Sequence, residues 1–272
     1  MPEVVVESPF GSDPVAHVPL GAAPLARVLT QVRFPRLTTL AAGDDAANAL
    51  AAAMSDRYPI LNEQREVAVT ITPEGVEQSP VTGKVWQLRS ADEQWQVSFG
   101  HSFLAVDTAS YSSREDFLAR VDDAWAAFVT VARPPFVERV GWRYINRISD
   151  EATLSGLAAL VRPEVLGGLP APADTGVRLI HGITESLYSI DEFDGLQARW
   201  GILPGGAVID PTLPPAPDPS WILDLDAFRT RRSGVTTAEV REHVHELAER
   251  AYQYFRWVVT PDFLTRFGGE IG

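Results

Sequence analysis

Two arginines are the residues best suited to bind a ligand: Arg33 and Arg143, each followed directly by an aromatic residue. They lie in residues 27–34 and 137–148, whose alternating pattern predicts β-strands. A guanidinium group matches the geometry of a carboxylate or a phosphate. We therefore expect the two arginines to approach each other across paired strands, where they could hold a small anionic ligand. The alternative, which the 36 acidic residues of the chain favour, is a structural ion-pair network with Asp92, Asp107, Glu138 or Asp226.

Three further residues of the segment 137–148 are candidates for the same ligand site. Trp142 and Tyr144 offer aromatic surface, and Asn146 offers an amide. Strand alternation places these three side chains on the face opposite Arg143. Packing into the core is therefore the alternative role for the two aromatic rings.

Asp224 and Asp226 are two carboxylates on one face of the predicted strand 221–226. Paired carboxylates can bind magnesium or act as acid and base, but they can also form ion pairs with the arginines. We favour the ion pairs and predict neither a catalytic residue nor a metal ligand. His243 and His245 do not change this, because two residues on a helix place them about 200° apart.

The composition limits the classes of protein to which the chain can belong. It has 272 residues, no cysteine and a formal net charge of −13. The lack of cysteine excludes a disulfide scaffold, a thiolate zinc site and a cysteine nucleophile. We see neither a secretory signal nor an apolar run of about 18 residues, so we expect a cytoplasmic protein with no membrane partner. No motif indicates a cofactor.

The predicted elements follow the same order twice along the chain. Residues 25–135 predict β-α-β-β-β-β-α, and residues 136–260 predict β-α-β-β-β-α. Prolines and glycines predict a loop over residues 73–84 in the first half. The remaining segments are an N-terminal arm, residues 1–24, and a C-terminal tail, residues 261–272.

Runs of strands between two long amphipathic helices predict an α+β fold with an antiparallel sheet. The long helices should begin at Ser113 and Thr236, because each residue opens a capping-box pattern. We expect one domain built from a duplicated βαβββα unit, with both long helices on one face of a curved sheet. A pseudo-twofold axis would pass between the strands at 27–34 and 137–148.

Two motifs resemble those of a sporadically distributed family of uncharacterised bacterial proteins. Residues 24–35 fit its pattern Pro-Leu-x-x-Val-x-x-x-Val-Arg-Phe-Pro, and residues 139–146 fit Arg-x-Gly-x-Arg-Tyr-Ile-Asn. The resemblance spans most of the chain and implies no activity, although the patchy distribution implies an accessory or defence locus. The element order is also similar to that of SOUL and GyrI-like small-molecule-binding proteins and of TATA-binding-protein-like folds.

We expect a non-catalytic binding protein with a ligand cleft on the curved sheet. One alternative is a protein-interaction component, such as an antitoxin, immunity or adaptor protein, that binds a partner protein through its acidic surface. Another is an enzyme of unrecognised type. The candidate ligand-binding residues are Arg33, Arg143, Trp142, Tyr144, Asn146, Asp224 and Asp226.

We predict that the protein does not bind nucleic acid at physiological salt. Binding to nucleic acid depends largely on basic side chains that neutralise its phosphates. A net charge of −13 opposes such binding. Fluorescence anisotropy with labelled duplex DNA and single-stranded RNA at about 150 mM salt should show no sub-micromolar affinity. Sub-micromolar binding would mean that the arginines gather on one surface strongly enough to overcome the net charge.

Overall fold

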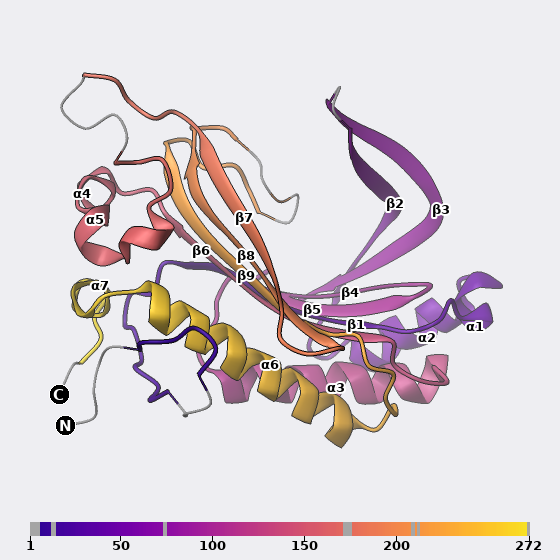
Figure 1. The fold of residues 1–272 in the computed structure, drawn as a ribbon. Coiled ribbons are helices and arrows are strands. Elements are labelled where there is room, and N and C mark those ends of the chain that lie inside the picture. Colours follow the sequence, from indigo (N-terminus) through magenta and orange to yellow (C-terminus); the bar gives the residue numbers. More distant parts are fainter. Residues whose placement is uncertain are drawn as a thin grey trace. The chain divides into compact units, whose positions relative to one another are not determined.

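The protein is α+β and contains a nine-stranded antiparallel sheet (Figure 1). The computed structural model describes residues 6–11, 15–72, 75–170, 176–207, 210 and 213–270, without the side chains of residues 65–82. The predicted fold class and the antiparallel sheet are confirmed.

The nine strands of the described chain are β1 (Leu25–Arg33), β2 (Ile60–Thr72), β3 (Gly75–Arg89), β4 (Trp95–Gly100), β5 (Phe103–Thr108), β6 (Arg139–Ile148), β7 (Gly182–Ser189), β8 (Asp194–Leu203) and β9 (Ser220–Arg229). Its α-helices are α1 (Thr38–Ala41), α2 (Asp45–Met54), α3 (Arg114–Ala132), α4 (Glu151–Ser155), α5 (Leu157–Leu160), α6 (Thr237–Val258) and α7 (Pro261–Arg266). The order of hydrogen-bonded strands in the sheet is β2-β3-β4-β5-β1-β6-β9-β8-β7.

The chain divides into two compact units. Unit 1 comprises Met1–Val28, Trp142–Phe228 and Glu246–Gly272, and unit 2 comprises Leu29–Gly141 and Arg229–His245. The boundary falls inside β1, β6, β9 and α6, so unit 1 takes segments from both halves of the sequence.

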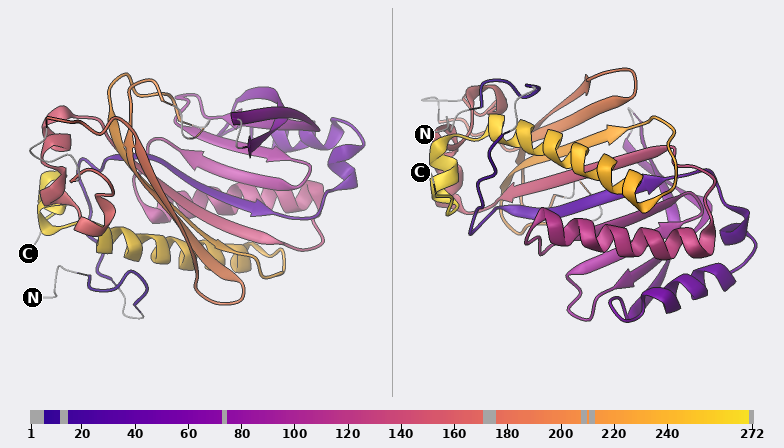
Figure 2. Two further views of the ribbon diagram at one scale, coloured as in Figure 1. Left: turned by 45° about the horizontal axis from the view of Figure 1, so that its top comes forward. Right: turned by 90° about the horizontal axis from the view of Figure 1, so that it is seen from below.

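In unit 2, α3 covers its sheet with a continuous apolar stripe. Phe117, Val121, Trp125 and Phe128 are fully buried at helical spacing. The helix begins as predicted, because the Ser113 side chain accepts the N–H of Asp116. The first turns of α6 lie beside α3 (Figure 2). The Trp125 indole N–H donates to the Val235 carbonyl, and Asp122 of α3 forms an ion pair with Arg241 of α6.

The expected loop over residues 73–84 is wrong, because most of this segment belongs to β3. Its backbone pairs with β2 along a long antiparallel hairpin, from Ile60 opposite Arg89 to Thr72 opposite Gly75. Pro80 lies opposite Val67, immediately beside a register irregularity. A proline is tolerated in a sheet at such an irregularity, so its presence did not end the strand.

In unit 1, the C-terminal part of α6 packs on one face of the sheet, where Leu247 and Ala251 are fully buried. Helices α4, α5 and α7 lie together at one end of this unit (Figure 1). Thr260 joins two of them, since its N–H donates to the Leu160 carbonyl and its side chain caps α7. Phe263 of α7 is buried, so the segment expected as a tail contains a packed helix.

The N-terminal arm lies against α6, whose side chains bind its backbone. Gln253 Nε2 donates to the Gly11 carbonyl at 2.7 Å, and Arg256 Nη1 donates to the Ala16 carbonyl at 2.6 Å. The Val18 N–H donates to the Tyr252 hydroxyl at 2.8 Å. These contacts do not depend on the side chains of the arm.

Among the helices that the structure describes, none is both long and apolar enough to cross a membrane.

We predict that Gly201→Ala destabilises unit 1 more than Gly206→Ala does. Both glycines have a positive φ, of 146° and 78°, which costs an alanine about 1–2 kcal/mol. A Cβ at Gly201 would also lie 1.9 Å from the Gly182 carbonyl oxygen, whereas Gly206 has nothing within 4 Å. We expect a loss of about 3 kcal/mol or more for Gly201→Ala in chemical denaturation. Equal losses for the two variants would contradict the close approach of β7 and β8.

Candidate functional site

Three strands of unit 1 bring two arginines to one buried carboxylate. Arg143 on β6 donates from Nε and Nη2 to the two carboxylate oxygens of Asp224 on β9, at 2.7 Å each. Arg199 on β8 donates from Nε at 3.0 Å and from Nη2 at 2.5 Å to Asp224 Oδ2. The Asp224 carboxylate is therefore bound by two guanidinium groups.

A second carboxylate comes from the segment between β8 and β9. Asp210 Oδ2 lies 2.6 Å from Arg143 Nη1. The same segment supplies the Pro214 carbonyl, which accepts a hydrogen bond of 2.7 Å from Arg147 on β6. Arg143, Arg199, Asp210 and Asp224 are called the arginine–aspartate cluster below.

The cluster is largely removed from water, and its formal charges balance. The side chain of Asp224 is 2% exposed, and that of Arg143 is 17% exposed. Burial alone would lower the pKa of Arg143, but the hydrogen bonds and charges of Asp224 and Asp210 outweigh it and raise the pKa. Arg143 is therefore charged at every accessible pH, and breaking the cluster would leave a buried charge uncompensated.

This geometry is that of a structural ion pair. Both carboxylate oxygens of Asp224 already accept hydrogen bonds from guanidinium groups. The guanidinium of Arg143 is already bound by two carboxylates, which occupy the place that an anionic ligand would take. In the part of the chain that the structure describes, no three histidine or carboxylate side chains converge as metal ligands.

Among the contacts of the described residues, none joins the Arg33 side chain to the arginine–aspartate cluster. Its carbonyl accepts the N–H of Glu138 at 2.7 Å, and the Pro24 carbonyl accepts the N–H of Arg147 at 2.8 Å. This register places Arg33 beside the start of β6, five residues before Arg143. The backbone hydrogen bonds therefore do not show the expected approach of Arg33 to Arg143.

The other candidate residues lie in different surroundings. Trp142 is fully buried, and Tyr144 and Asn146 are nearly so. The rings of Trp142 and Tyr144 meet edge to face with centroids 5.3 Å apart, and Asn146 Nδ2 donates to the Leu223 carbonyl at 3.4 Å. These three residues contribute to the interior, while Asp226 is half-buried.

Sequence reasoning missed Arg199 and Asp210. Arg199 lies in the alternating strand β8, and that alternation could have assigned it to a polar face. Asp210 stands among prolines and glycines outside any periodic pattern, so no local signal indicates its partner.

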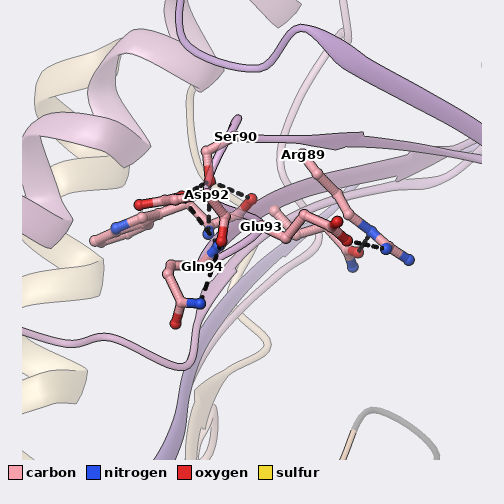
Figure 3. Close-up of polar contacts among 7 residues, drawn as sticks. Arg89, Ser90, Asp92, Glu93 and Gln94 are labelled. Carbon is pink, nitrogen blue, oxygen red and sulfur yellow. Dashed lines mark hydrogen bonds and ion pairs between the residues drawn. The ribbon is translucent and has the colours of Figure 1, made fainter.

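A second group of polar contacts closes the turn between β3 and β4 (Figure 3). Ser90 donates to Asp92 Oδ1 at 2.5 Å, and the Gln94 N–H donates to the same oxygen at 3.1 Å. These two hydrogen bonds lower the pKa of Asp92, and the hydrogen bond from Ser90 has the larger effect. Glu93 has a φ of 55° and accepts from Arg89. The group stabilises the turn and places no side chain for chemistry.

The strand β7 forms one edge of the sheet and exposes apolar side chains. Leu187 on β7 is 70% exposed, and Ile180 just before the strand is 62% exposed. Single exposed apolar residues are ordinary on a protein surface, but here they accompany an edge strand, which can pair with another chain. The β7 edge, residues 182–189, is therefore the second candidate site.

No known protein family matches the chain, and no curated protein matches it significantly. The resemblance to an uncharacterised bacterial family therefore stays a prediction.

We predict that Asp224→Ala lowers the free energy of unfolding by about 3–5 kcal/mol, because it leaves two guanidinium groups without their shared carboxylate. The matched control is Asp123→Ala, which removes an exposed ion pair of 2.9 Å with Arg57. That variant should lose about 1 kcal/mol or less. Chemical denaturation measures both losses, and a small loss for Asp224→Ala would contradict the role of the cluster.

Proposed function

We propose that the protein is a non-catalytic interaction module that binds a partner chain along the β7 edge. The observation that carries the proposal is the position of Leu187, a highly exposed leucine on the last strand of the sheet. An extended segment that adds to such an edge gains main-chain hydrogen bonds, and it covers the apolar side chains beside them.

The arginine–aspartate cluster gives weaker support to the other two hypotheses. A small anionic ligand at Arg143 would have to displace Asp224 or Asp210, both of which bond directly to the guanidinium. An enzyme that uses Asp224 would need a carboxylate that is not already bound by two cations. A partner strand that adds to the β7 edge would need to displace neither Asp224 nor Asp210 from its guanidinium partners.

We also infer that the two halves of the sequence are copies of one unit, and the order of strands supports this inference. The first half reads β1-β5-β4-β3 outward from the middle of the sheet, and the second reads β6-β9-β8-β7. In this correspondence β7 takes the place of β3. The first half continues with β2, which pairs with β3, whereas the second half ends at β7. Among the strands that the structure describes, none thus covers the β7 edge in the way that β2 covers β3.

We predict that Leu187→Lys abolishes partner binding without destabilising the protein. An exposed side chain contributes within about 0.5 kcal/mol to folding, but a lysine at the edge discourages strand pairing. The control is Leu61→Lys, which alters an exposed leucine on β2, the opposite edge strand of the order.

The measurement is capture, by the immobilised protein, of purified proteins encoded beside its own gene. We expect at least one to bind the wild type and the Leu61→Lys variant but not the Leu187→Lys variant. Equal capture by all three proteins, or capture of none, would contradict the proposal.

A further inference from the structure

We propose that the partner of the β7 edge is an extended protein segment that runs antiparallel to β7 and places a basic side chain beside Glu185. This inference rests on the proposed function and names the chemistry of its partner. It follows from the backbone pattern of β7, from its side chains and from the local charge.

The hairpin register shows which backbone groups of β7 face outward. The Ile190 N–H donates to the Asp194 carbonyl at 2.9 Å, and pairs continue to Gly182 opposite Ile202. Hydrogen-bonded and non-hydrogen-bonded pairs alternate in an antiparallel hairpin. Even-numbered residues of β7 therefore bond to β8, and the odd-numbered residues direct their N–H and C=O groups away from it.

The outward-facing residues are Ile183, Glu185, Leu187 and Ser189. Among the residues that the structure describes, none forms a backbone hydrogen bond with these four outside the β7–β8 pairing. Four such residues give a row of donors and acceptors that an added strand can satisfy. The proposed occupant is therefore an extended chain rather than a helix or a small molecule.

The antiparallel direction follows from the inferred duplication. In the first half, β2 pairs with β3 in an antiparallel register. An added strand beside β7 would take the equivalent place, and antiparallel pairs are slightly more stable per residue than parallel pairs.

The side chains of β7 define what the partner must carry. Tyr188 points toward α6, where its hydroxyl lies 3.2 Å from that of Tyr254. Strand alternation then places Ile183, Glu185 and Leu187 together on the other face. Residues directly opposite on paired strands have Cβ atoms about 4.5–5.5 Å apart, so opposite charges and apolar pairs are favoured. The matching segment has a basic residue between two apolar ones, at every second position.

The local charge favours a basic partner over a second copy of this chain. Glu185 is exposed, and Arg199, its neighbour directly opposite on β8, directs its guanidinium to Asp224. Asp191 and Glu192 in the adjoining turn add negative charge. A second copy would bring the same acidic edge and a further net charge of −13, whereas a basic segment is attracted during encounter.

The test uses two labelled peptides and the full-length protein. The basic peptide is Thr-Thr-Val-Thr-Arg-Thr-Val-Thr-Thr, and the acidic peptide has Glu in place of Arg. Fluorescence anisotropy measures both affinities. We expect the wild type to bind the basic peptide about tenfold more tightly, because an opposite-charge pair across two strands is stabilising and a like-charge pair is destabilising. Glu185→Arg should reverse this preference.

The matched control is Glu115→Arg, which makes the same change in net charge at an exposed position of α3. This variant should keep the preference of the wild type for the basic peptide. A preference that shifts equally in both variants would show that net charge alone attracts the peptide, and it would overturn the inference.

Amide hydrogen exchange separates the remaining outcomes. Binding of the basic peptide should slow exchange at Glu185 and Leu187. Equal binding of both peptides with slowed exchange would overturn the basic partner but leave the edge as a binding site. No binding and no change in exchange would overturn strand addition itself. A protein that sediments as a dimer, and that Leu187→Lys converts to a monomer, would identify a second copy as the occupant and also overturn the inference.

Discussion

The buried carboxylate of Asp224 is the constraint on which the polar face of unit 1 depends. It accepts hydrogen bonds from Arg143 and Arg199 and so links β6, β8 and β9. None of these charges is tolerable alone in a buried site, because desolvation is compensated only when opposite charges are bonded with good geometry. Asp210 completes the balance from a segment outside the sheet. The four formal charges of the arginine–aspartate cluster thus cancel in the folded protein.

This neutrality shifts attention from the centre of the sheet to its margin. A sheet that does not close on itself has two edges, and proteins usually protect them with charges, irregularities or covering segments. The β7 edge has Glu185 as its charged residue, yet it also exposes Leu187. The carboxylate discourages pairing between identical copies, while the leucine and the outward backbone groups favour a partner of opposite charge. In the proposed function, this one short strand resists pairing with its own copies and binds an extended segment of opposite charge.

The elements predicted correctly are those whose signals are local. Ser113 opens α3 because its hydroxyl caps an N–H three residues away, and the alternation of residues 137–148 predicts β6 without knowledge of its neighbours. The errors arose where tertiary contacts override a local signal. Pro80 indicates a loop by its composition, but pairing with β2 accommodates it within β3. Thr260 and Pro261 are a local start signal for α7, but this helix has only six residues, and burial of Phe263 against the rest of unit 1 stabilises it.

The sequence by itself determined the α+β class, the long helices and the faces on which the side chains of each strand lie, because periodicity is a property of neighbouring residues. It also indicated that Asp224 could meet an arginine. Only the tertiary structure decided which arginines these are. The register between strands depends on hydrogen bonds between segments far apart in the chain, and that register sets Arg33 beside Glu138. Arg143 and Arg199 share Asp224 because β9 lies beside both of their strands in the sheet order, a neighbourhood that no local pattern encodes.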